Sequence, residues 1–130
     1  MKFLSNEWVS QYIESLNQDE NFKRITRKWE DNILFFFQEK DSMESKGILL
    51  TIHHGVCKEG KIVSDVEEVP MTIIGSMANW KILFQGKISF FNLIIEQKLR
   101  MKGDVDKIMR NLPAINAMVN KIIEITEVEE

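Results

Sequence analysis

Cysteine, proline and long apolar runs are all scarce in this sequence. Its 130 residues include one cysteine, Cys57, and two prolines, Pro70 and Pro113. A single cysteine cannot form an internal disulfide or a thiolate metal cluster, so we expect a reducing, cytoplasmic setting. No apolar run approaches the ~18 residues of a membrane-spanning helix. The first residues reach Asn6 and Glu7 before an apolar signal-peptide core could form, so we expect no secretory leader.

An excess of charge of one sign is also lacking. The chain carries 17 basic and 20 acidic side chains, a net charge of −3. Residues 81–110 hold seven basic and three acidic side chains, which is too little for a nucleic-acid-binding surface. This segment is interpreted either as a solvated face or as a contact for an anionic membrane or a phosphate-bearing ligand. The composition is that of an ordinary globular chain, and the length suits a single domain over residues 1–130.

Helical periodicity is present at both ends of the chain. Ser5 is suited to cap a helix whose apolar face recurs at helical spacing as far as Leu16. Asp19 opens a second, shorter helix. Near the C-terminus, Asp104 caps a segment with an apolar stripe from Val105 to Ile122, and Pro113 predicts a kink or break within that segment.

Extended segments lie between these helices. The pattern predicts a turn at residues 58–61 and helices that begin at Ser76 and Ser89, the first of them ending at Gly86. The expected strands are residues 33–37, 47–57, 62–66, 69–74 and 98–102. This order predicts an α+β domain with a mostly antiparallel sheet and helices packed on one of its faces.

Motifs of catalysis and metal binding are weak. Residues 55–62 match the first part of a phosphate-binding loop, but Ile62 stands where a Ser or Thr would bind Mg²⁺, so we predict a hairpin turn there. His53 and His54 are the only histidines. Because neighbours on a strand point to opposite faces, we expect no metal site from them. No cofactor is expected. An enzyme would need a buried polar pair with shifted pKa values, and the acidic residues of this sequence are scattered on polar faces with no such pair in evidence. We therefore predict that the chain is not an enzyme.

Apolar side chains, by contrast, are plentiful: eight Phe, three Trp and seven Met. The usual explanation is a packed core. Three features favour a lipid cavity as the alternative. Residues 33–37 are apolar on both faces of their strand, methionines suit adaptable apolar surfaces, and Pro113 allows the far half of the last helix to move separately.

The order of elements from Val69 to Asp104 is more specific. It comprises a strand (71–74), a helix with Trp80 that ends in Gly86-Lys87, a short helix (90–96), and an alternating strand, Lys98-Leu99-Arg100-Met101-Lys102, that ends in Gly103-Asp104. This arrangement resembles the sterol carrier protein 2 domain family. Gln97 departs from the family pattern, which commonly has a glycine just before the last strand.

The resemblance implies a five-stranded, mostly antiparallel sheet covered by helices. It also implies a tunnel between sheet and helices for a fatty acid, acyl-CoA, phospholipid or sterol-like lipid, closed by the terminal helix, with no chemistry of its own. Strand register decides which candidates line the tunnel and which belong to the core. The candidate lipid-binding residues are Phe35, Phe36, Phe37, Leu50, Ile52, Ile74, Trp80, Leu83, Phe84, Phe91, Ile94, Met101, Met109, Leu112 and Met118.

Two further expectations concern partners. Lys98, Arg100 and Lys102 share one face of their strand and are expected to contact an anionic head group or membrane transiently. The alternative function is an interaction or dimerisation module on the same fold, accessory to an enzyme, whose apolar groove buries a partner helix or a second copy of the chain.

Overall fold

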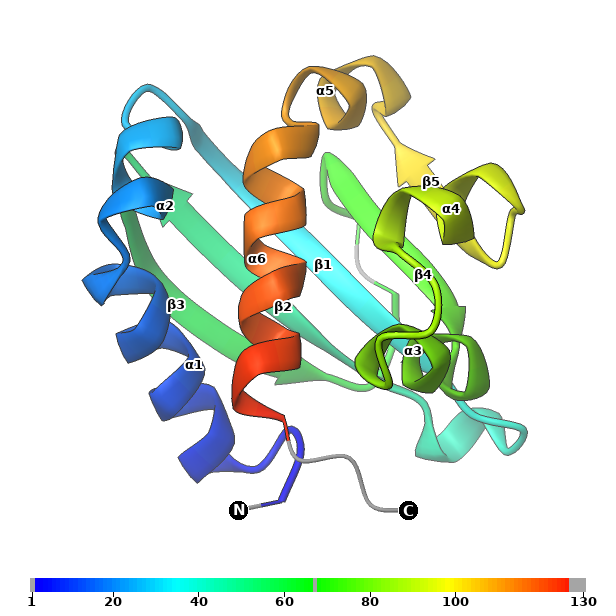
Figure 1. Ribbon diagram of the computed structural model, residues 1–130. Coiled ribbons are helices and arrows are strands. Elements are labelled where there is room, and N and C mark those ends of the chain that lie inside the picture. Colours follow the sequence, from blue (N-terminus) through cyan, green and yellow to red (C-terminus); the bar gives the residue numbers. More distant parts are fainter. Residues whose placement is uncertain (1, 67, 127–130) are drawn as a thin grey trace.

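In the part of the chain that the structure describes, one five-stranded sheet carries the α-helices on one of its faces, and the short turn between β1 and β2 lies at the end of these strands (Figure 1). The computed structural model describes residues 2–66 and 68–126. The strand order is β3-β2-β1-β4-β5; β1 pairs in parallel with β4, and the other neighbours are antiparallel. The expected fold class is therefore confirmed. The strands are β1 Glu30–Gln38, β2 Lys46–His53, β3 Val56–Val63, β4 Met71–Ser76 and β5 Leu99–Gly103.

The helices begin where the capping residues predict. The side chains of Ser5, Asp19, Ser76, Ser89 and Asp104 each accept a backbone N–H in the first turn that follows. Within the described residues, no helix has the length and apolarity needed to cross a membrane. The helices are α1 Asn6–Gln18, α2 Glu20–Ile25, the 3₁₀ turn η1 Ser42–Glu44, α3 Met77–Phe84, α4 Phe90–Ile95, α5 Val105–Arg110 and α6 Leu112–Ile125.

The break predicted near Pro113 is confirmed. Helix α5 ends before Asn111, and α6 begins with Pro113 in its first turn, where a missing N–H costs no helical hydrogen bond. Helix α6 then runs across the middle of the sheet (Figure 1). Its apolar stripe buries Ile115, Met118 and Ile122 against the sheet-side core.

Helix α6 is held along the side that faces α1 and α2. The buried Tyr12 hydroxyl donates to the Met118 carbonyl at 2.9 Å. Trp8 Nε1 donates to the Thr126 hydroxyl at 3.2 Å. Lys121 Nζ lies 3.3 Å from an Asp19 carboxylate oxygen. These three links fix α6 to the N-terminal helices and leave its other side for α3 and α4.

The far face of the sheet bears a small second cluster. Leu34, Phe36, Val63 and Ile74 are buried there, and Val69 packs against them. Val69 belongs to the connection from β3 to β4, which passes behind the sheet in Figure 1. That crossover covers apolar side chains that the helices do not reach.

The predicted hairpin turn at residues 58–61 is wrong. The chain turns at His54 and Gly55, which have φ values of 47° and 88°, and β3 already begins at Val56. Two-residue hairpin turns of this kind need positive φ at both central positions, which suits Gly and is tolerated by His. Gly60 lies within β3 instead, where a Cβ would approach Ile13 of α1 to 2.9 Å. Its role is to let α1 pack closely on the sheet.

Candidate functional site

Most of the predicted lipid-binding residues lie between the sheet and the helices. Trp80 is at their centre: its ring centroid lies 4.7 Å from that of Phe37 and 6.1 Å from that of Phe35. Trp80 Nε1 donates to the Phe36 carbonyl at 3.0 Å, which fixes the indole against β1. The predicted residues that belong to this larger buried cluster are Phe35, Phe37, Leu50, Ile52, Trp80, Leu83, Phe84 and Met118. In this conformation they pack against one another as a core.

Three predicted residues border that core. Ile94 of α4, Met101 of β5 and Leu112 of α6 are partly buried and pack against it. They lie on the side of the molecule where α4 and α5 cover β4 and β5 (Figure 1).

Two predicted residues lie on the wrong face of the sheet. Phe36 and Ile74 belong to the second cluster, behind the sheet and away from the helices. The physical reason is the alternation of side chains along a strand, which turns Phe36 away from its neighbours Phe35 and Phe37. A run of apolar residues on both faces means that β1 is covered twice, once by helices and once by the crossover.

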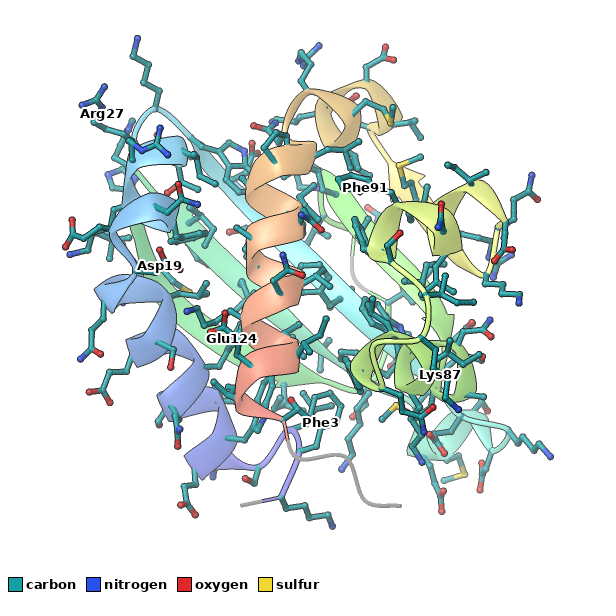
Figure 2. All side chains as sticks on the ribbon, in the orientation of Figure 1. Phe3, Asp19, Arg27, Lys87, Phe91 and Glu124 are labelled. Carbon is teal, nitrogen blue, oxygen red and sulfur yellow. The ribbon has the colours of Figure 1, made fainter. Side chains whose placement is uncertain are left out.

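Two more predicted residues are largely at the surface. The exposed fractions of Phe91 and Met109 are 42% and 51%. Phe91 lies between α4 and α6 in the view of Figure 2. Phe91 follows the buried Phe90 on α4, their ring centroids are 5.8 Å apart, and both side chains line a cavity.

That cavity is open to solvent, has a volume of about 400 Å³ and lies between the α3–α4 connection, α4 and α6. Leu83 and Phe91 are the predicted residues that line it. The other lining residues are not among the predicted ones, although Ser89 is predicted as a helix cap. The lining consists of Leu83, Gly86, Ile88, Ser89, Phe90, Phe91, Asn116, Asn120 and Ile123. Its walls are mainly apolar, and the two asparagines, one helical turn apart on α6, supply polar atoms.

A second cavity, of about 710 Å³, lies at the N-terminal segment. Lys2, Glu39, Glu44 and Lys46 are among its lining residues, so its surroundings are highly charged. Phe3 occupies its apolar side, with ring centroids 4.9 Å from Trp8, 5.1 Å from Phe37 and 5.5 Å from Phe84. Although larger, it suits a hydrocarbon less well than the cavity beside α6.

The buried titratable groups of the core are arranged to stay neutral. Burial raises the pKa of the Cys57 thiol to about 12 and, together with Cys57, raises that of the Tyr12 hydroxyl well above its usual value. A thiol reacts as its thiolate, so Cys57 is a poor nucleophile here. Among the described residues, every buried side-chain nitrogen and oxygen has a hydrogen-bond partner. The buried side chains of this core therefore serve to pack the fold, and neither Cys57 nor Tyr12 is activated for catalysis.

The two histidines are closer together than predicted. Their ring centroids are 4.4 Å apart, and both rings approach the Glu30 carboxylate. The expectation that neighbouring histidines must diverge is wrong because His54 lies in the turn, with positive φ, and not on a continuous strand. Glu30, His53 and His54 could together hold a metal ion.

Comparison with known sequences identifies a protein family for this chain. The sequence model of the SCP-2 sterol transfer family matches residues 12–115. The comparison with curated protein sequences finds no match.

Solved structures share the fold at low sequence identity. A crystal structure of sterol carrier protein 2 is 19% identical, with a TM-score of 0.84 over 96% of this chain and 100% of that one. A conserved hypothetical protein of Thermus thermophilus is 19% identical, with a TM-score of 0.81 over 100% and 94% of the two chains. A sec-alkyl sulfatase is 15% identical, with a TM-score of 0.53 over 71% of this chain and 14% of its own. At these identities the likeness concerns the fold.

Proposed function

The chain belongs to the SCP-2 sterol transfer family, and from this membership we propose that it binds and transfers an apolar ligand. The ligand class is a fatty acid, acyl-CoA, phospholipid or sterol-like lipid. The observation that carries the proposal is the cavity of about 400 Å³ between α3, α4 and α6. Small-molecule pockets typically range over ~300–1,000 Å³ and are mostly apolar with a few polar groups.

Hydrocarbon burial supplies the binding energy. Each buried methylene contributes about 0.8 kcal/mol, so ten methylenes would contribute about 8 kcal/mol before the cost of immobilising the ligand. Asn116, Asn120 and Ser89 can hydrogen-bond a polar end group at the cavity. Such a site holds many hydrocarbon chains and discriminates weakly between head groups.

The proposed path into the core starts at this cavity. Leu83 belongs to both the cavity lining and the buried cluster around Trp80. Because α6 is tied to α1 and α2, we expect the cavity to widen by movement of α4 and the α3–α4 connection. A longer ligand would then replace contacts that the core residues now make with one another.

Native mass spectrometry tests this proposal. The purified protein is incubated with palmitate, palmitoyl-CoA or phosphatidylcholine, with a denatured sample as control. We expect a bound mass of lipid size that is lost on denaturation. Protein that stays free of all three lipids would refute the ligand-binding proposal.

A cavity-filling variant tests the location. Asn120 is exposed on α6 and lines the cavity, so Asn120→Trp should narrow it without disturbing the core and reduce lipid uptake at least about tenfold. Gln11→Trp, an equivalent change on an exposed position of α1, should leave uptake unchanged. Uptake by Asn120→Trp equal to that of the unaltered protein would place the ligand elsewhere.

We propose that this binding domain extends over residues 1–130, is not catalytic and works in the cytoplasm. The neutral Cys57 and Tyr12 support the absence of catalysis, since neither offers an activated nucleophile or base. A reduced, buried cysteine fits a reducing compartment. Incubation with palmitoyl-CoA would test the first point, because any release of coenzyme A would contradict it.

Contact with an anionic membrane is a further part of the proposal. Arg100 and Lys102 are exposed on the edge strand β5, on the face opposite Leu99 and Met101. Lys98 lies beside them but is 3.9 Å from the Glu96 carboxylate. Each basic side chain near an anionic surface contributes about 1 kcal/mol at most, so binding should be transient.

Vesicle binding measures this contribution. Vesicles rich in phosphatidylserine should bind the protein more weakly as salt is raised, because the Debye length shortens from ~10 Å at 0.1 M to ~3 Å at 1 M. Arg100→Glu with Lys102→Glu should weaken binding more than Lys28→Glu, an exposed change near α2. Binding that is insensitive to salt would refute the electrostatic contact.

An interaction module is the second candidate function. Phe91 and Ile95 on α4 and Met109 on α5 are exposed, Ile95 to 75%, and the fold also occurs as a small part of a sec-alkyl sulfatase chain. Light scattering across a concentration series distinguishes the two functions. Dimers that form without lipid uptake and are lost in Ile95→Lys would favour the interaction module.

A further inference from the structure

A cluster of metal-ligating side chains lies at the β1–β2 end of the sheet, away from the lipid cavity. Glu30 opens β1 and is the register partner of His53, the last residue of β2. His54 follows in the turn. The ligand atoms of the three residues all lie within 4.8 Å of one another.

Both oxygens of the Glu30 carboxylate take part. Oε1 lies 3.2 Å from His53 Nδ1, and Oε2 lies 3.6 Å from His54 Nε2. Two donor atoms bound tetrahedrally at ~2.0–2.1 Å from one zinc ion lie about 3.3 Å apart. The separations at Glu30 are close to this value, and the three side chains are 40–65% exposed, so they can rotate to bring both nitrogens to one ion.

The tautomer of His54 suits metal binding. Its Nδ1 lies 3.1 Å from the Arg27 carbonyl oxygen, which can only accept a hydrogen bond. In the neutral ring, Nδ1–H donates to this carbonyl and the lone pair lies on Nε2, the nitrogen nearer the Glu30 carboxylate. A backbone carbonyl on the second ring nitrogen is the usual support of a metal-bound histidine.

The backbone around the cluster is well fixed. The His54 N–H donates to the Trp29 carbonyl at 2.8 Å. A Cβ at Gly55 would approach the Lys23 carbonyl of α2 to 3.1 Å, so the turn packs closely on that helix. Figure 2 shows Arg27 at this corner of the molecule, where α2 leads into β1. His54 therefore comes from a turn whose position depends on α2 as well as on the strands, and His53 comes from the end of β2 beside it.

A cavity of about 310 Å³ adjoins the cluster, lined by Glu30, Asp31, His53 and Lys58 among others. It has room for water to complete the coordination. Asp31 is occupied by its own partners, accepting from Trp29 Nε1 at 2.8 Å and pairing with Lys107 at 2.7 Å, so it is not counted as a ligand. Lys58 adds a positive charge beside the site, which favours moderate over tight affinity.

We propose that Glu30, His53 and His54 form a binding site for a divalent transition metal of the zinc type. Two imidazole nitrogens and one carboxylate oxygen are ligands that Zn²⁺ accepts, and imidazole also suits Cu²⁺ and Ni²⁺. The site binds the ion at the β1–β2 end of the sheet and is independent of the lipid cavity. Cys57 does not contribute, because its thiol is buried in the core.

Zinc titration by calorimetry tests the site, using the full chain without any added histidine tag. The unaltered protein should bind one Zn²⁺. Glu30→Gln, His53→Gln and His54→Asn should each bind at least about tenfold more weakly, since even outer-shell changes typically cost 10–100-fold. Asn is chosen at position 54 because it tolerates the positive φ of the turn. Glu44→Gln, on η1 at the opposite end of β1, is the control and should bind normally.

Cobalt absorption provides a second readout. Co²⁺ bound by the three residues should give the visible bands of a low-symmetry site in the unaltered protein and in Glu44→Gln, and not in His54→Asn. No uptake of Zn²⁺ at millimolar concentration would overturn the proposal and leave a histidine–carboxylate ion pair only. Equal uptake by the unaltered protein and any one of the three variants would overturn it as well.

Discussion

Asp19 joins two parts of the molecule through its two carboxylate oxygens. Oδ1 accepts the N–H groups of Asn21 and Phe22, at 2.9 and 3.1 Å, and so caps α2. Oδ2 lies 3.3 Å from Lys121 on α6. Substitution by Asn should keep the cap and remove the ion pair, whereas substitution by Ala should remove both.

The expected losses differ in size. The side chains of Lys121 and Asp19 are 14% and 29% exposed, and such partly exposed pairs contribute up to about 1 kcal/mol. Loss of an N-cap costs ~0.5–2 kcal/mol. At pH 7 we expect Asp19→Asn to lower the free energy of unfolding by about 0.5–1 kcal/mol, and Asp19→Ala by about 1 kcal/mol more. Each kcal/mol corresponds to roughly 3–5 °C in Tm for a chain of this length.

The effect of Asp19→Asn should also depend on pH. The Phe22 N–H, followed by Lys121, lowers the pKa of Asp19. A lowered pKa means that the stabilisation is present above the unfolded value, ~3.9, and is lost as pH falls through the folded value. Hydrogen bonds to Glu124 and Asp19 raise the pKa of Lys121, so its contribution is lost only as pH rises above ~10.4.

Urea unfolding followed by tryptophan fluorescence at pH 7 and pH 2.5 checks this reasoning. Asp41→Asn is the matched control, because Asp41 caps η1 through the Met43 N–H and Asn keeps such a cap. Two results would refute the account: an Asp19→Asn loss as large as that of Asp19→Ala at pH 7, or a deficit of Asp19→Asn that is undiminished at pH 2.5.

Three further predictions concern the core. Tyr12→Phe removes the buried hydrogen bond to Met118 and should cost about 1 kcal/mol in thermal or urea unfolding; no change would mean that the bond contributes nothing to stability. Ile115→Ala, at a fully buried position of α6, should cost about 2–5 kcal/mol by the same measurement, and a loss below about 1 kcal/mol would contradict the close packing of α6 on the sheet. The Cys57 thiol, with its pKa raised to about 12 by burial, should react with a disulfide reagent at least a hundredfold more slowly in native than in urea-unfolded protein; equal rates would show that it is accessible.

The elements with local signals could be predicted from the sequence. Five helix caps, the apolar period of α1 and α6, and the break before Pro113 all depend on residues a few positions apart. The order of strands and helices was enough to place the fold in its class. The turn at His54 and Gly55 was not predicted, because the charged residues 58–61, which include Gly60, have a composition more typical of a turn than His54-Gly55.

The site was less predictable because it depends on contacts between distant segments. Phe36 and Ile74 were assigned to the lining although the pleat turns them behind the sheet. The cavity itself is formed by Ser89 and Phe90 from one segment and Asn116 and Asn120 from another. Nothing in the local pattern of either segment reports that the two face each other. The meeting of both histidines at Glu30 likewise depends on a single backbone dihedral angle in the turn.

The position of α6 over the centre of the sheet has a consequence for synthesis of the chain on the ribosome. β1 is in the middle of the sheet, yet its parallel neighbour β4 and its cover α6 are made much later. At ordinary elongation rates the delay between β1 and the end of α6 is on the order of 5–20 s. During this interval the nascent chain presents uncovered apolar strands to its surroundings, and the hydrogen-bond partner of Tyr12, Met118, is still to be made 106 residues further along the chain. Shielding by a chaperone during that time would therefore matter more to this protein than to one whose helices and strands pair in the order of their synthesis.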